Sequence, residues 1–365
     1  MESYLFPIKI AFITFPFIAL FFTFPFAIYQ YKKYGYINKF RIFILYSFLL
    51  YLIVAYYLII LPLPQTRDIK SLQRPGTQHY NLVPFSFIHD ILRETSVVFN
   101  KPSTYKYLLT ERAFLQAVFN AILLLPLGVY LRYYFKKDLK KTIATTFFVS
   151  LFFEVTQLTG LYGIYNAPYR LFDVDDLFLN TLGGYIGYVI TPMFTFFLPN
   201  TDEIDKNINL QEMRVSYFRR GLAFLIDINI VRLIPKIEDN IIYKGTIYFI
   251  YFILIAYLTN GKTIGNWLTS IKIKGEESKL KFSEIFIRYT TLYFGVFGVN
   301  RVLSSVATMN EYTDIGYAII IIVILQLIIN LLILIHFLLC IIRRDRFFYE
   351  KFSDTSIVIS KGSPN

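Results

Sequence analysis

The feature that most constrains this chain is a succession of long apolar segments. A helix needs about 20 apolar residues to cross the hydrocarbon core of a bilayer, and nine segments of that kind occur in the sequence. They are residues 7–29, 41–63, 112–134, 142–163, 176–198, 217–236, 241–260, 284–305 and 315–342. Hydrophobic residues make up 55% of the 365 residues, more than one soluble core would bury. The sequence therefore predicts an all-α, polytopic transmembrane protein with about nine spans.

Basic residues between the apolar segments predict the orientation of the chain. Segment 30–41 has four basic residues and no acid, and segment 132–141 has five basic residues and one acid. Segment 261–283 has five basic residues and two acids, and "RRDR" at 343–346 is also basic. If all nine segments cross, these regions share one side, which the positive-inside rule makes cytoplasmic. We expect a multi-pass protein of the cell membrane, with its N-terminus outside and its C-terminus in the cytoplasm.

A polar stretch near residues 199–216 divides the apolar segments into two groups. It begins at Pro199 with "PNTDEIDKNINLQEMR" and has few large apolar residues. We expect a five-helix membrane domain over 1–200, a cytoplasmic linker over 201–216, and a second helical bundle with a cytoplasmic tail over 217–365.

Composition also limits the partners and cofactors. The net charge of +12 fits the basic loops of a membrane protein better than nucleic-acid binding, because no aromatic-plus-basic recognition motif is present. One cysteine, Cys340, excludes an internal disulfide, and three histidines argue against a histidine-rich metal site. No cofactor is evident. A divalent cation held by Asp and Glu oxygens is chemically possible. We expect membrane lipids as partners.

Polar residues within the apolar segments are the first candidates for a site, because ionisable groups in a span are costly. Glu154 and Gln157 are three residues apart in the fourth segment and so share a helix face. Asp173, Asp176 and Asn180 share a face where the fifth segment begins. Gly183 and Gly187 then form a GxxxG pattern, which permits a close helix pair. Such a pair would place all five polar residues at one level, in an outward-facing acidic pocket.

A structural interpretation of these residues stays open. An aspartate at a helix start, Asp173 or Asp175, is a favourable N-cap, and Arg170 is then a local ion-pair partner. The preceding outer loop adds "NLVPFSFIHD", in which Asn81 would shape a turn and "FSFI" would enter the headgroup layer. Histidine is the residue type whose ordinary pKa lies nearest neutral pH, and His89 in this stretch is therefore a further candidate.

The second half has its own polar set. Arg220 and Asp227 lie two turns apart on one face of the sixth segment. They form either a buried ion pair that fixes packing or a cation or proton site. The stretch "GKTIGNWLTSIKI" follows at 261–273, with Gly261 and Gly265, and lacks the spacing of a phosphate-binding P-loop. The run "IKIKG" at 271–275, which overlaps the end of this stretch, favours a short surface strand or an interfacial segment.

Four stretches of the first half form a recognisable series: "NLVPF" (81–85), "FNAILLLPLGVYL" (119–131), "SLFFEVTQ" (150–157) and "RLFDVDDLFLNTLGGYIGY" (170–188). In their order and spacing they resemble the VanZ-like family. The resemblance implies a bacterial envelope protein, since the founding member is linked to resistance against teicoplanin, a lipoglycopeptide. The family does not settle a biochemical activity.

The second half resembles the RDD family of membrane domains. The matching stretches are "RRGLAFLID" (219–227), "GKTIGNWLTSIKI" (261–273) and "FFYEKFSDTSIVI" (347–359). Asn266 stands where the family usually has lysine, and the family's last aspartate corresponds to Glu350 or to Asp354. Transport is suggested for a few RDD proteins. The fusion of the two resemblances implies a Gram-positive cytoplasmic membrane.

Three functions follow as hypotheses. The first is glycopeptide resistance through an outward acidic pocket that binds a lipoglycopeptide or a lipid-linked cell-wall precursor. The second is a membrane enzyme on an envelope lipid or peptidoglycan precursor, with Glu154 as general acid or base. The third is a cation- or proton-coupled transporter with Asp227 and Glu154 as its proton or cation sites. The sequence has no HExxH, GxSxG or CxxC signature that would decide whether the protein is an enzyme.

Overall fold

The computed structural model describes residues 2–98, 100–206, 208–234, 241–309 and 316–361. The chain forms two compact units. Unit 1 comprises Met1–Thr23 and Asn38–Lys206, and unit 2 comprises Phe24–Ile37 and Asn207–Asn365. The ends of two predicted spans, residues 235–236 and residue 315, lie outside the described residues. The domain boundaries drawn from the sequence stay predictions.

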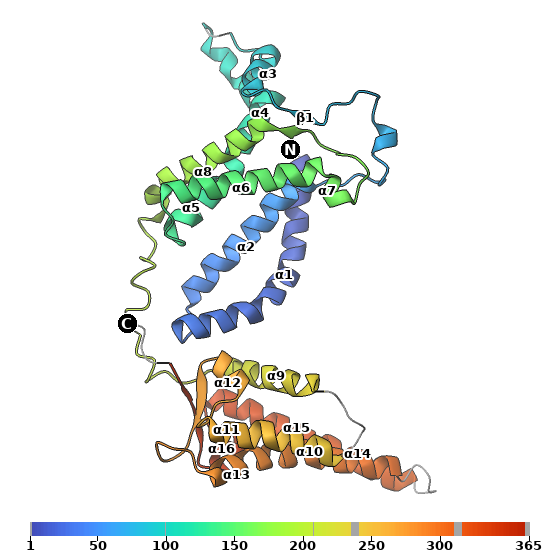
Figure 1. Cartoon of the computed structure of the whole chain (residues 1–365), viewed down its shortest axis with the longest axis vertical. Coiled ribbons are helices and arrows are strands. Elements are labelled where there is room, and N and C mark those ends of the chain that lie inside the picture. Colours follow the sequence, from blue (N-terminus) through green and yellow to red (C-terminus); the bar gives the residue numbers. More distant parts are fainter. Residues whose placement is uncertain (1, 99, 207, 235–240, 310–315, 362–365) are drawn as a thin grey trace. The chain divides into compact units, whose positions relative to one another are not determined.

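Unit 1 is built from helices with one minimal sheet (Figure 1). The first helix, α1, is shared, because its N-terminal part belongs to unit 1 and its C-terminal part to unit 2. The elements are α1 (Glu2–Tyr34), α2 (Lys39–Ile60), η1 (Lys70–Leu72), β1 (Tyr80–Asn81), α3 (Ser86–Glu94), η2 (Pro102–Leu109), α4 (Arg112–Leu123), α5 (Leu125–Tyr133), α6 (Leu139–Leu158), α7 (Gly160–Gly163), β2 (Phe172–Asp173) and α8 (Val174–Thr195).

Helix α8 is the centre of unit 1, where α4, α5 and α6 all pack against it. Its glycines allow this. A Cβ at Gly183 would lie 1.9 Å from the carbonyl oxygen of Ala121, and one at Gly187 would lie 2.0 Å from that of Leu125. Small residues permit backbones to approach in this way. The close approach expected of this GxxxG pair is present, but it is made to α4 and α5 and not to α6, the helix that carries Glu154. Gly184, between them, faces Thr146 of α6.

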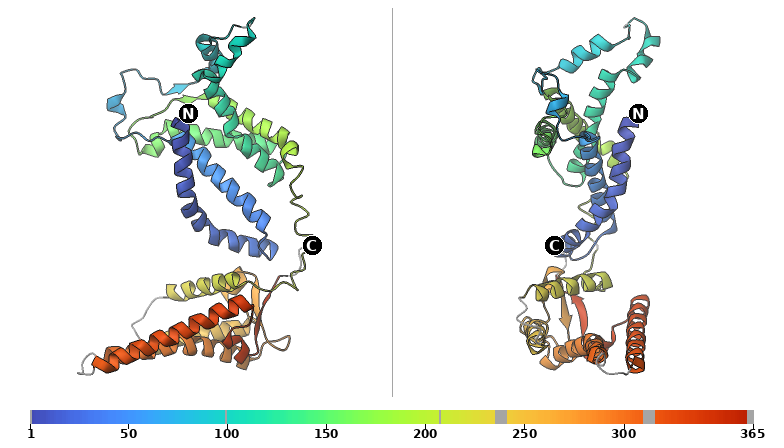
Figure 2. Two further views of the ribbon diagram at one scale, coloured as in Figure 1. Left: turned by 180° about the vertical axis from the view of Figure 1, so that it is seen from behind. Right: turned by 90° about the vertical axis from the view of Figure 1, so that its right-hand side faces the viewer.

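Unit 2 combines helices with one two-stranded antiparallel sheet. The strand expected at "IKIKG" is β3, which pairs with β4 from Ile271 opposite Ile359 to Lys274 opposite Ser356. The long helix α15 and its neighbour α14 are orange to red in Figure 2. The elements are α9 (Tyr217–Leu233), α10 (Ile241–Tyr248), the π-helix η3 (Phe249–Ile255), α11 (Ala256–Leu258), α12 (Ile264–Leu268), β3 (Ile271–Lys274), α13 (Phe282–Leu292), the π-helix η4 (Tyr293–Gly298), α14 (Val299–Met309), α15 (Gly316–Arg343), α16 (Phe348–Phe352) and β4 (Ser356–Ile359).

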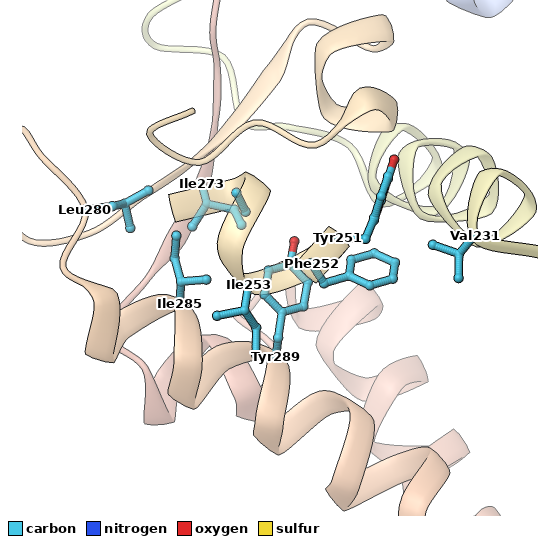
Figure 3. Packing of buried hydrophobic residues seen from close by; sticks show 9 residues of the cluster. Val231, Tyr251, Phe252, Ile253, Ile273, Leu280, Ile285 and Tyr289 are labelled. Atoms are coloured by element: carbon cyan, nitrogen blue, oxygen red, sulfur yellow. The ribbon is translucent and has the colours of Figure 1, made fainter. Parts of the chain in front are cut away.

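The core of unit 2 gathers apolar side chains from α9, η3, β3 and α13 (Figure 3). Phe252 and Ile285 are almost fully buried in it, and Ile273 enters from the strand. The aromatic ring of Tyr289 lies 5.3 Å from that of Phe252, a usual separation for a packed aromatic pair.

Helices fill most of each predicted apolar segment, and the fold class is confirmed as helical and of membrane type. Among the described residues, five helices are long and apolar enough to cross a bilayer. They are Leu5–Tyr34, Lys39–Ile60, Arg112–Tyr133, Val174–Thr195 and Ile320–Arg343. The count of nine crossing segments stays a prediction.

Two buried carboxylates tie unit 2 together. Glu350 accepts from Arg220 at 2.9 Å and from Arg288 at 3.2 Å, so α16 is joined to α9 and α13. Asp227 accepts hydrogen bonds from Tyr251 Oη, Thr263 Oγ1 and the Gly265 amide, at 2.6–2.7 Å. Arg220 and Asp227 therefore pair with other groups and not with each other.

Gly261, Gly265 and Asp354 complete the predicted RDD-like set. Gly261 has a φ of +92° and lies against the β3 backbone, where a Cβ would be 2.2 Å from the Ile273 carbonyl oxygen. A Cβ at Gly265 would lie 2.1 Å from the Ala223 carbonyl oxygen of α9. Asp354 is exposed and has a φ of +47°. Of the two acids that the family pattern left open, Glu350 is the one held by arginines.

We predict that Gly187→Val destabilises the protein by about 1–3 kcal/mol, the usual cost of forcing atoms into a packed interior. The new side chain has to displace the α5 backbone. The loss of heat stability is measured by the fraction of the monodisperse peak that remains in size-exclusion chromatography after heating. Gly221→Ala is the control, because a Cβ there meets nothing within 4 Å. Equal heat stability of the two variants would contradict the close contact between Gly187 of α8 and the backbone of α5.

We predict a similar contrast for the two acids near the C-terminus. Glu350→Gln leaves two arginines without their carboxylate, and breaking a buried ion pair costs about 3–5 kcal/mol. Asp354→Asn should leave the heat stability unchanged, because asparagine tolerates a positive φ. The same heating assay compares them, and a larger loss in Asp354→Asn would refute the assignment.

Candidate functional site

A polar cavity of about 280 Å³ lies in unit 1 where α3, α4 and the start of α8 meet. Most of its lining is polar or charged. The lining residues are Ser86, Phe87, Asp90, Glu94, Arg112, Ala113, Gln116, Ala117, Asn120, Asp173, Asp175, Asp176 and Leu179.

The first turn of α8 is held in place by its own aspartates. Asp173 is the N-cap of α8, with its carboxylate accepting from the Asp175 amide at 2.9 Å. The parallel β1–β2 pairing sets Asn81 opposite Asp173, and Asn81 Nδ2 lies 3.3 Å from both Asp173 carboxylate oxygens. Asn81 also shapes the expected turn, since its Oδ1 accepts from the Val83 amide.

Asp175 fixes the outer loop to α8. Its carboxylate accepts from the amides of Phe85 and Phe87 at 2.6 and 2.9 Å and from Ser86 Oγ at 2.8 Å. Phe85 has a φ of +63°, which turns the chain into α3. The Asp175 side chain is buried. Burying its carboxylate without hydrogen bonds would cost free energy, and these three donors remove that cost. Asp175 therefore builds the wall of the cavity.

Glu154 supports the same corner from α6. It is 1% exposed, and its Oε2 accepts from the backbone amide of Asp173 at 3.0 Å. One turn earlier, Ser150 accepts from Asn180 Nδ2 at 2.9 Å and donates to the Asp176 carbonyl oxygen at 3.3 Å. The structure thus brings Glu154 and Asn180 next to the start of α8, behind the lining of the cavity.

Three predicted residues lie elsewhere. Gln157 donates from Nε2 to the Ile59 carbonyl oxygen at 3.0 Å, and Arg170 donates to the Leu61 carbonyl oxygen at 2.8 Å. Both therefore bind the end of α2. His89 is exposed on α3 and does not line the cavity.

Two rows of polar residues that our sequence analysis missed complete the lining. Arg112, Gln116 and Asn120 recur every fourth residue along α4, and Asn120 Nδ2 donates to Asp176 Oδ1. Ser86, Asp90 and Glu94 have the same spacing on α3. A spacing of four puts residues on one helix face, so this signal was present in the sequence.

The charge of the cavity is mainly negative. Asp90, Glu94, Asp173 and Asp176 line it, and Arg112 is the one cation among the described lining residues. Burial raises the pKa of the Asp173 carboxyl, while hydrogen bonds from the Asp175 amide and Asn81 oppose the rise. Such a lining suits an ammonium group, and Arg112 adds a place for a phosphate or carboxylate.

A metal site is not apparent in the described part of the chain, where no group of three or more His, Cys, Asp or Glu side chains is arranged to hold an ion. The oxygens of Asp175 already accept three protein donors. The divalent cation stays a prediction.

Comparison with known families gives one match in each half of the chain. Residues 48–196 match the VanZ/LLP1 family model, and residues 241–354 match the RDD family model. The first match contains all of the residues that line the cavity. Searches of curated proteins and of solved structures gave no match. The chain is therefore a helical membrane protein that joins a VanZ-like domain to an RDD family domain.

Proposed function

We propose that this protein protects the cell envelope against glycopeptide antibiotics of the teicoplanin type, by binding a cationic lipoglycopeptide or a lipid-linked cell-wall precursor in the acidic cavity. The observation that carries the proposal is the lining itself, in which the acids Asp90, Glu94 and Asp176 share one cavity with Arg112. A ligand with both an ammonium group and an acidic group would find a partner for each. The proposal places the cavity on the outer side of the membrane.

The outer face of α3 supports a ligand that stays attached to the membrane. Ile88 and Leu92 are 46% and 57% exposed, and Phe85 at the start of the helix is 51% exposed. The opposite face of α3 supplies Asp90 and Glu94 to the cavity. A helix with one polar and one apolar face is suited to the membrane interface. In this arrangement the cavity opens at the level of lipid headgroups.

A resistance assay tests the proposed function. In a deletion strain, the wild-type gene should restore teicoplanin tolerance, and Asp90→Asn with Glu94→Gln should not, because the double variant removes two ligand-facing charges. Asp202→Asn with Glu203→Gln is the matched control, since both acids are exposed and outside the cavity lining. Immunoblots of membranes check that the variants accumulate equally. Full protection by the double cavity variant at equal protein level would refute the proposal.

The cavity also predicts a pH dependence of cation binding. Because burial raises the pKa of Asp173, its carboxylate takes up a proton at a higher pH than an ordinary aspartate does. Binding of dodecylamine, a simple cationic amphiphile, should be strongest above this raised pKa and weaken as the pH falls through it. Calorimetric titration of the purified protein measures the affinity. Asp173→Asn should bind about tenfold more weakly at neutral pH, the effect of about 1.4 kcal/mol, and with a flatter pH profile. An unchanged profile would exclude Asp173 as a ligand-facing charge.

The enzyme hypothesis has less support from the geometry. Glu154, its proposed general acid or base, is buried behind the cavity and accepts a backbone hydrogen bond. A general base has to reach the proton that it abstracts. For the transporter hypothesis, both Asp227 oxygens accept hydrogen bonds from unit 2 itself. Binding in the cavity of unit 1 is therefore the function that we favour.

A further inference from the structure

Three lysines from distant parts of the sequence lie around the C-terminal end of α1 in unit 2. Lys32 lies in the last turn of α1, Lys262 just before α12, and Lys361 after β4. The Lys32 ammonium lies 3.4 Å from the centre of the Trp267 ring, a cation–π contact. Lys361 Nζ donates to the Lys32 carbonyl oxygen at 2.6 Å and to that of Lys33. The positive charges of Lys262 and Lys361 both act on Lys32.

Among the residues that the structure describes, no aspartate or glutamate forms an ion pair with Lys32, Lys262 or Lys361. All three side chains are partly buried. Burial lowers the pKa of Lys361, as expected for an ammonium without a counter-charge. Like charges this close repel each other, and a bound anion would relieve that repulsion.

The position of the three lysines points to the headgroup layer of a membrane. Helix α1 is long and apolar enough to cross a bilayer from Leu5 to Tyr34, and Lys32 is in its last turn. Trp267 is 56% exposed. Tryptophan and lysine at the end of a spanning helix are typical of the membrane–water interface, where lysines attract anionic lipids.

We propose that Lys32, Lys262 and Lys361 form a binding site for a phosphate-bearing anion, and that its ligand is the headgroup of an anionic phospholipid. Trp267 forms one wall of the site, next to the acyl chains. The site belongs to unit 2 and is separate from the acidic cavity of unit 1 and from the function proposed for it.

The single tryptophan of the chain provides the measurement. The full-length protein is reconstituted in phosphatidylcholine vesicles that contain a small fraction of phosphatidylglycerol. In one preparation the phosphatidylglycerol is brominated near the glycerol end of its chains, and in the other an equal amount of phosphatidylcholine is brominated. Bromine quenches a tryptophan that it contacts. We expect stronger quenching of Trp267 by the brominated phosphatidylglycerol.

Charge removal tests whether the three lysines cause the preference. Each lysine near an anionic surface contributes about 1 kcal/mol, or about fivefold in affinity at low salt. Lys262→Gln, at a side chain without a hydrogen bond in the described part of the chain, should therefore lower the preference about fivefold, and Lys262→Arg should keep it. Replacing all three by glutamine should abolish it. The charge-matched control replaces three exposed lysines of unit 2 by glutamine, namely Lys274, Lys279 and Lys281. This variant should keep the preference for phosphatidylglycerol unchanged.

Two results would overturn the inference. Equal quenching by the two brominated lipids in the wild type excludes an anionic lipid site, as does a preference that the control variant loses as fully as the triple variant. Inorganic phosphate separates the two sources of the anion. If phosphate at constant ionic strength restores the fluorescence at millimolar or lower concentration, the site prefers a soluble phosphate to the headgroup, and a lipid as its ligand is refuted. If only anionic lipid competes, the headgroup is the ligand.

Discussion

The rest of unit 1 depends on the close approach of α8 to the helices around it. At Gly183 and Gly187 no side chain separates the backbone of α8 from the carbonyl oxygens of α4 and α5. At Gly184 the α8 backbone lies similarly close to the Thr146 side chain of α6. Contact at this distance fixes both the rotation of α8 and its position along its axis. The first turn of α8 is thereby fixed too, and with it the place of Asp173 and Asp176 opposite α4.

Local features of the sequence predicted the helices, because length and apolarity are properties of each segment on its own. They predicted part of the site for the same reason. Glu154 reaches the start of α8 and Asn180 lies behind it. Gln157 does not join them, although it is only three residues from Glu154. Three residues turn a helix by about 300°, so the two side chains point about 60° apart, and Gln157 contacts α2 instead.

The other half of the cavity could not be placed from the spans alone. Asp90 and Glu94 belong to a loop helix, and they reach the cavity because the chain between α3 and α4 folds back on itself. Glu111 helps to close that loop, since its Oε1 accepts from the Ser96 amide at 2.7 Å. Contacts of this kind depend on the tertiary fold and leave no periodic pattern. The polar rows on α3 and α4 are each visible in the sequence as a periodic pattern. That the two rows face the same cavity could not be predicted from those patterns.

The distribution of satisfied and available charges separates structural acids from those that can serve a ligand. Glu350 has two arginines and Asp227 has three donors, so their binding capacity is used within unit 2. Asp175 is used in the same way in unit 1. Asp90 pairs with Arg93 at 3.2 Å on the surface, and a pair of that kind contributes little and exchanges readily. Among the described lining residues, Asp90 and Glu94 have ion pairs of this kind with Arg93, so they are the acids that a cationic ligand recruits most readily.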